Sequence, residues 1–132
     1  MGYRSDVRVL TDSEGFEKMQ DIAWKLAEER NLDKSSVLFP EFGEDSSRRY
    51  NYYDAQESYL CFGFDFVKWY DGYEDVDLFM DVLKVANKDG VDWQFMRVGE
   101  EYDDVEEDRS DNFYNSHIAE TTVMTARVEI VC

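Results

Sequence analysis

The stretch Tyr59–Trp69, YLCFGFDFVKW, is the feature that most restricts the fold of this chain. Large apolar side chains stand at every second position, which is the period of a β-strand. A strand face this aromatic has to be covered, so we expect helices against it and a more exposed opposite face, which includes Cys61 and Asp65. The residues of the face to be covered are Leu60, Phe62, Phe64 and Phe66.

Two segments carry apolar side chains at helical spacing and can supply this cover. The first predicted helix spans residues 13–30. The pattern Thr11-x-x-Glu14 predicts a capping box at its start, and Asn31 is a suitable residue for its end.

The second predicted helix spans residues 73–88 and places Asp71-x-x-Glu74 at its start. Gly90 is a suitable residue for its end. The acidic residues crowded into its first turns are favoured there by the helix dipole, so part of the acidity has a structural explanation.

Alternating patterns predict further strands at residues 3–10, 91–98 and 121–131. Residues 32–57 form an irregular excursion or a hairpin, in which RRYNYY is a candidate short strand. The sequence therefore predicts one acidic α+β domain over residues 1–132. Its mostly antiparallel sheet has four to five strands with two helices on one face, and a ferredoxin-like variant is the leading topology.

The chain is strongly acidic, with 31 Asp and Glu against 14 Lys and Arg and a net charge of −17. Residues 71–132 hold 17 of the acidic and 5 of the basic residues, a net charge of −12. Such a field opposes direct binding to nucleic acid or anionic membrane and attracts basic surfaces. No apolar run suits a membrane span or a secretory signal. Cys61 and Cys132 are expected to be free thiols in a reducing cytosol, with a disulfide as the alternative.

Catalytic constellations are weak in this sequence, and we expect a protein that is not an enzyme and has no cofactor or metal. The single histidine, His117, adjoins Ser116, but sequence neighbours rarely form a nucleophile–base pair. Cys61 has no basic cluster nearby to lower its pKa. One histidine and two distant cysteines do not make a zinc site.

The run Gly99–Asp111, GEEYDDVEEDRSD, has three readings: a solvated loop, a cation site, or a surface for a basic partner. Calcium favours oxygen ligands, but Val105 breaks the spacing of an EF-hand loop. Carboxylates fixed in space can instead occupy a groove built for phosphates. The candidate partner-binding residues are Asp71, Glu74, Asp75, Asp77, Asp81, Glu100, Glu101, Asp103, Asp104, Glu106, Glu107, Asp108 and Asp111.

Three motifs resemble a family of small acidic proteins encoded by bacteriophages and prophages: MGYRSDV at residues 1–7, VKWYDGYEDV at 67–76 and FMRVGEE at 95–101. The resemblance does not extend to residues 32–57. It implies an anti-defence protein, such as an anti-CRISPR or anti-restriction inhibitor, acting in the host bacterial cytoplasm. Its partner would be a basic nucleic-acid-binding protein that meets a DNA-mimicking face. The alternative is a cation-binding or structural accessory phage protein. The oligomeric state is not predicted.

Overall fold

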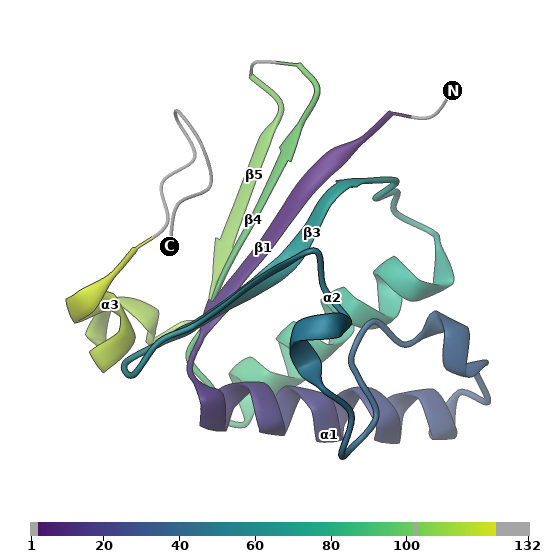
Figure 1. Ribbon diagram of the computed structural model, residues 1–132, viewed down its shortest axis with the longest axis horizontal. Coiled ribbons are helices and arrows are strands. Elements are labelled where there is room, and N and C mark those ends of the chain that lie inside the picture. Colours follow the sequence, from purple (N-terminus) through teal and green to yellow (C-terminus); the bar gives the residue numbers. More distant parts are fainter. Residues whose placement is uncertain (1–2, 102, 124–132) are drawn as a thin grey trace.

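The computed structural model describes residues 3–101 and 103–123 (Figure 1). Three short 3₁₀ turns, at Lys34–Ser36, Ser46–Arg48 and Phe113–Asn115, join its regular elements. Those elements are β1 (Ser5–Thr11), α1 (Ser13–Glu29), β2 (Tyr52–Ala55), β3 (Leu60–Val67), α2 (Glu74–Lys88), β4 (Gln94–Gly99), β5 (Val105–Arg109) and α3 (His117–Thr121).

The five strands form one antiparallel sheet in the order β2-β3-β1-β4-β5. Strands β1 to β4, with the two long helices between them, have the β-α-β-β-α-β order and the 4-1-3-2 arrangement of a ferredoxin-like fold. Helices α1 and α2 pack on the same face of the sheet (Figure 1). The predicted α+β class and the helices on one face are therefore confirmed. Strand β5 is an addition at one edge.

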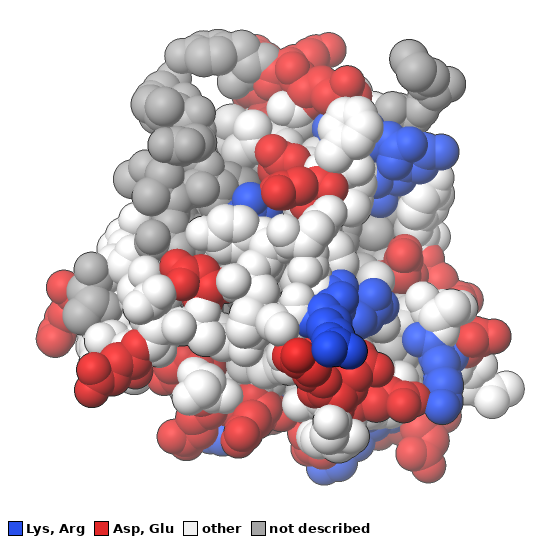
Figure 2. Space-filling view, in the orientation of Figure 1, with Lys and Arg blue, Asp and Glu red and all other residues white. Residues whose placement is uncertain are grey.

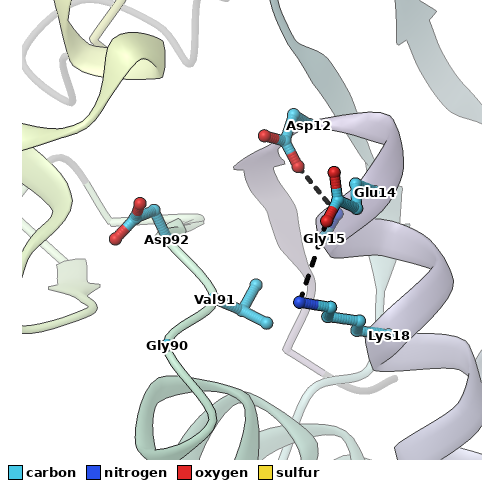
Figure 3. Close-up of a pocket in the computed structure, with 7 residues that line it drawn as sticks. All are labelled: Asp12, Glu14, Gly15, Lys18, Gly90, Val91 and Asp92. Atoms are coloured by element: carbon cyan, nitrogen blue, oxygen red, sulfur yellow. Dashed lines mark hydrogen bonds and ion pairs between the residues drawn. The ribbon is translucent and has the colours of Figure 1, made fainter.

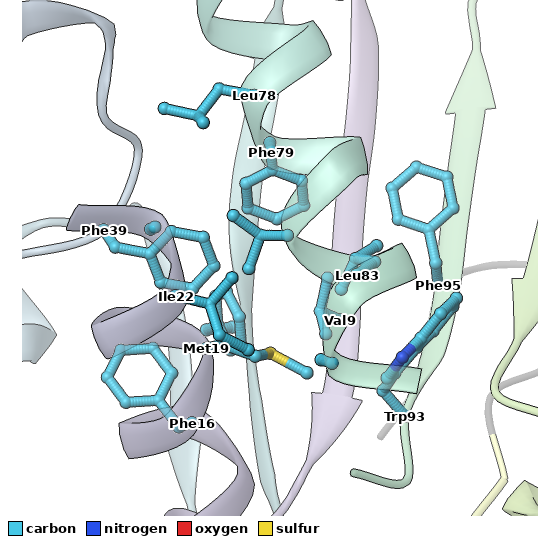
Figure 4. Close-up of a cluster of buried hydrophobic side chains, with 14 of the residues drawn as sticks. Val9, Phe16, Met19, Ile22, Phe39, Leu78, Phe79, Leu83, Trp93 and Phe95 are labelled. Carbon is cyan, nitrogen blue, oxygen red and sulfur yellow. The ribbon is translucent and has the colours of Figure 1, made fainter. Parts of the chain in front are cut away.

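The main core lies between this face and the two long helices (Figure 4). It is largely aromatic: the Phe16 and Phe62 rings lie 5.0 Å apart, and the Phe39 and Phe79 rings stack at 5.3 Å. Phe39 and Tyr50 are buried, although both belong to the excursion at residues 32–57. The excursion therefore closes the core, and its predicted short strand is β2, which forms a hairpin with β3.

The opposite face of the sheet carries a second, smaller apolar cluster, in which Ile118 of α3 and Phe113 cover Leu10, Cys61 and Met96. The expectation that this face is more exposed is wrong at its centre, because α3 and the turn before it pack there. Cys61 is fully buried and disulfide-bonded, so the expected free thiol is also wrong. Cys132 lies outside the described residues.

A β-bulge interrupts β3 near its end. Ser5 pairs with Val67 and Val7 pairs with Phe64, so β3 has one more residue than β1 over this interval. Phe66 takes a left-handed backbone with φ of 55° and is exposed, whereas Val67 turns toward the main core. The prediction that Phe66 lies against the helices is therefore wrong, because the bulge reverses the alternation.

The helix starts differ in detail from the predicted capping boxes. Asp12, not Thr11, caps α1, and its Oδ1 accepts the Gly15 N–H at 2.7 Å. Tyr73 is the N-cap residue of α2, and no side chain caps this helix.

The predicted helix ends are confirmed, because the chain leaves α1 at Asn31 and α2 near Gly90 with positive φ at both residues. The strand predicted for residues 121–131 lies, from residue 124 on, outside the described residues. Within the described part, Thr121 belongs to α3.

Candidate partner-binding groove

The β4–β5 ladder decides which carboxylates of the acidic run face the helices. Phe95 of β4 points into the main core, and Asp108 lies opposite it in the register. Arg97 lies two residues further along the same face of β4, opposite Glu106. Glu106 and Asp108 therefore stand on the helix side of the sheet. Glu107 stands on the other side, where it pairs with Arg109 at 3.2 Å.

Helix α2 lies beside this edge of the sheet, and a groove of about 500 Å³ separates the two. Asp77 and Asp81 line it from α2, and Glu106 and Asp108 line it from β5. Asp71 also lines it. Among the described residues that line the groove, Lys84 is the one basic side chain against five carboxylates. The structure thus brings helix and strand carboxylates together around a concave surface.

Apolar side chains complete the lining of the groove. Trp69 and Met80 belong to it, and both also pack against the main core. The Trp69 ring meets Phe79 edge to face, with ring centroids 5.2 Å apart, and lies 6.5 Å from Phe95. These contacts fix the indole in place. The groove therefore joins a rigid aromatic surface to two acidic walls, one on a helix and one on a strand.

A second hollow of about 260 Å³ continues the groove and shares Trp69, Asp71 and Glu106 with it. Here Arg97 binds Asp104 through Nη2 at 2.7 Å and Glu106 through Nε at 3.0 Å. The Arg97 hydrogen bond, and then that of the Tyr3 hydroxyl, lower the pKa of Asp104. Part of the acidic run is therefore strand β5 of the β4–β5 hairpin, and Asp104 and Glu106 are held by Arg97. The interpretation as a solvated loop does not apply to residues 105–109.

The remaining predicted residues surround the groove without lining it. Glu74 turns to Ser36, whose hydroxyl donates to it at 2.9 Å. Glu100 accepts the Arg4 N–H at 2.7 Å, next to the β4–β5 turn that also carries Glu101 and Asp103. Asp75 Oδ1 accepts a hydrogen bond from the Val76 N–H within the first turn of α2. The Asp111 N–H donates to Asn87 after β5 ends.

The sequence did not identify Trp69, Met80, Arg97 and Tyr3 as parts of this site. Three of them had a visible signal, because Tyr3, Trp69 and Arg97 lie within the MGYRSDV, VKWYDGYEDV and FMRVGEE motifs. Their role depends on the strand register, which residue spacing does not specify.

Acidic side chains also spread beyond the groove. On the face in Figure 2 they gather over α1 and near the β4–β5 turn, and several basic side chains lie among them. Those of α1 are partly neutralised by neighbours on the same helix, as in the Asp21–Lys25 pair at 2.9 Å. The groove differs from this surface in being concave and in drawing its carboxylates from two elements.

A smaller hollow of about 120 Å³ lies at the start of α1 (Figure 3). Asp12 caps the helix here, and its Oδ2 lies 3.2 Å from His117 Nε2. Burial, and then the charge of Asp12, raise the pKa of Asp92. Ser116 caps α3 and is not directed to His117. The lining residues are Asp12, Glu14, Gly15, Lys18, Gly90, Val91 and Asp92.

Over residues 3–101 and 103–123, no group of three or more His, Cys, Asp or Glu side chains is arranged to hold a metal ion. Within the same part of the chain, no helix combines the length and apolar character needed to cross a membrane. Comparisons with protein-family models, curated proteins and solved structures found no match for this chain.

Proposed function

We propose that this chain is a phage-encoded inhibitor of a bacterial defence system and acts by binding rather than by catalysis. Its acidic groove would occupy the surface with which a defence protein binds nucleic acid, in the cytoplasm of the host. The observation that carries the proposal is the groove between α2 and β5, which five carboxylates and one lysine line. Two of these carboxylates already have a basic partner, since Asp81 pairs with Arg30 at 2.9 Å and Glu106 with Arg97 at 3.0 Å. Asp71, Asp77 and Asp108 leave most of the negative charge for a partner.

The arrangement suits a basic partner for two physical reasons. Its acidic walls stand on a helix and a paired strand, so little conformational freedom is lost when the partner binds. The chain's net charge of −17 steers basic surfaces toward it over long distances. The resemblance of MGYRSDV and the two other motifs to phage proteins is the reason for choosing a defence protein as the partner.

Co-purification tests the proposal directly. The tagged chain is incubated at low and moderate salt with lysate of bacteria that carry CRISPR or restriction systems. We expect it to recover a nucleic-acid-binding protein and to release that protein as the salt concentration rises. Recovery of no such protein at either salt concentration would count against the proposal.

A pair of charge-reversal variants then tests the groove. Asp77→Lys with Asp108→Lys places a positive charge on each wall. Glu17→Lys with Glu29→Lys makes the same change in net charge on the exposed face of α1. We expect the groove variant to weaken binding roughly tenfold or more and the α1 variant to weaken it much less. Equal losses would indicate attraction by net charge alone.

A further inference from the structure

Phe66 is an exposed aromatic residue in a conformation that its side chain disfavours. Its φ is 55°, and 68 % of the residue is exposed to solvent. Among the described non-glycine residues, Asn31 is the other one with positive φ, and asparagine is well suited to end a helix in this way. A bulky aromatic side chain at the bulge position has no such local reason.

The fold gains little from the phenyl ring at this position. The bulge needs a left-handed residue, and glycine adopts that conformation without steric cost. The bulge itself is held through the backbone, since the Phe66 N–H donates to Asp6 Oδ1 at 2.8 Å. A mostly exposed ring contributes little hydrophobic burial. The strain and the exposure together point to a role for the ring in contact with another molecule.

The surroundings of the ring indicate the chemistry of that molecule. The Arg4 guanidinium lies over the Phe66 ring, 5.3 Å from its centroid, so the ring already serves as a cation–π acceptor. The Arg4 N–H binds Glu100, which connects this site to the acidic β4–β5 turn. Tyr3, the residue before Arg4, donates to Asp104 in the hollow that continues the groove.

We propose that Phe66 is an anchor for an arginine side chain in a basic segment of the partner. The arginine would stack on the ring while neighbouring basic residues of the same segment meet Glu100 and the acidic β4–β5 turn. This inference rests on the proposed function, because it assumes the same basic partner. It adds a contact that charge alone does not provide, since aromatic side chains are often the anchors of an interface.

The experiment measures the binding of a hexa-arginine peptide to the intact chain by calorimetry. Phe66→Gly removes the ring and suits the left-handed backbone. The control is Phe42→Gly, because Phe42 is comparably exposed, at 62 %, and has no positive φ. We expect Phe66→Gly to weaken binding about two- to fivefold and Phe42→Gly to leave it unchanged. We also expect Phe66→Gly to keep or raise the midpoint of thermal unfolding.

The outcomes separate this inference from the proposed function. If Phe66→Gly binds like the wild type while the groove charge reversal weakens binding, the Phe66 inference is overturned and the proposed function stands. If the wild type binds no peptide even at low salt, both fail. A clear fall in the unfolding midpoint of Phe66→Gly would assign the ring to the fold. If sedimentation shows self-association that Phe66→Gly abolishes, the occupant is a second copy of the chain, which also overturns the inference.

Discussion

At the scale of single residues, Arg97 links the fold to the candidate site. It lies in β4, is mostly buried and reaches two carboxylates of the hairpin, Asp104 and Glu106. Its Nη1 also donates to the Ser5 hydroxyl in β1. One cation thus connects three strands and neutralises part of the charge beside the groove.

Replacement of Arg97 by Met should destabilise the fold, because Met keeps an unbranched apolar stem but loses the hydrogen bonds of the guanidinium. We expect a loss of about 1–2 kcal/mol in the free energy of unfolding, allowing for screening at the partly exposed carboxylates. Urea denaturation at pH 7 measures it. The matched control is Arg109→Met, whose pair with Glu107 is more exposed, and which should cost less than about 0.5 kcal/mol.

The stabilisation by Arg97 should also depend on pH. The pKa of Asp104 is lowered in the folded state, chiefly by Arg97. The stabilisation is therefore present above the ordinary carboxyl pKa of about 3.9 and is lost as the pH falls through the lower, folded value. The stability difference between wild type and Arg97→Met should shrink across that window. A difference that stays constant down to pH 2 would show that packing, not charge, is responsible.

The pKa of Asp92 is shifted in the opposite direction from that of Asp104. Burial and the nearby Asp12 raise its pKa, so its charged form opposes folding once the pH exceeds that raised value. We expect Asp92→Asn to raise the midpoint of thermal unfolding at pH 7. The gain should disappear below about pH 4, where the protonated Asp92 of the wild type is as neutral as the Asn of the variant. Thermal melts monitored by circular dichroism at the two pH values test this. A gain that persists in acid would contradict it.

At the scale of elements, the helices and strands that were predicted correctly are the ones with one apolar face. Strands β1, β3 and β4 and helices α1 and α2 each bury one side, and this burial produces the spacing that was recognised. Strand β5 was missed because it is an edge strand with all five residues exposed. Val105 is its one apolar residue, so it has no apolar period. The groove could not be predicted for the same reason, because one of its walls is this strand.

The two helix starts give a matched test of capping. Asp12 accepts a backbone N–H of α1, whereas Asp71, the predicted cap of α2, lies before the Tyr73 N-cap. We expect Asp12→Ala to cost about 0.5–2 kcal/mol, and Asp71→Ala to change stability by less than about 0.5 kcal/mol. Chemical denaturation of both variants decides it. Asp12→Asn keeps an oxygen that can cap the helix, so it should lower the free energy of unfolding much less than Asp12→Ala. If the two losses are equal, the stabilisation comes from the contact between Asp12 and His117 and not from the cap.

At the scale of the whole molecule, a small aromatic core supports a surface with a large excess of negative charge. The net charge of −17 is spread over one compact sheet and its helices, so like charges repel one another in the folded state. The fold tolerates this repulsion, and the groove concentrates part of it in one place.

Salt should therefore stabilise the free protein and weaken its complex. We expect the midpoint of thermal unfolding to rise between about 20 mM and 500 mM sodium chloride, because the Debye length falls from over 20 Å to under 5 Å. Differential scanning calorimetry measures this. A midpoint that falls with salt would mean that ion pairs such as Arg97–Asp104 outweigh the repulsion.

Strand β5 also has a consequence for the behaviour of the protein in concentrated solution. A five-residue strand at the margin of an open sheet is a template onto which another polypeptide can add its own strand. Three neighbouring carboxylates, Glu106, Glu107 and Asp108, oppose such an addition through their negative charge. The acidic wall of the groove therefore also protects the free edge of the sheet from pairing with further copies of the chain.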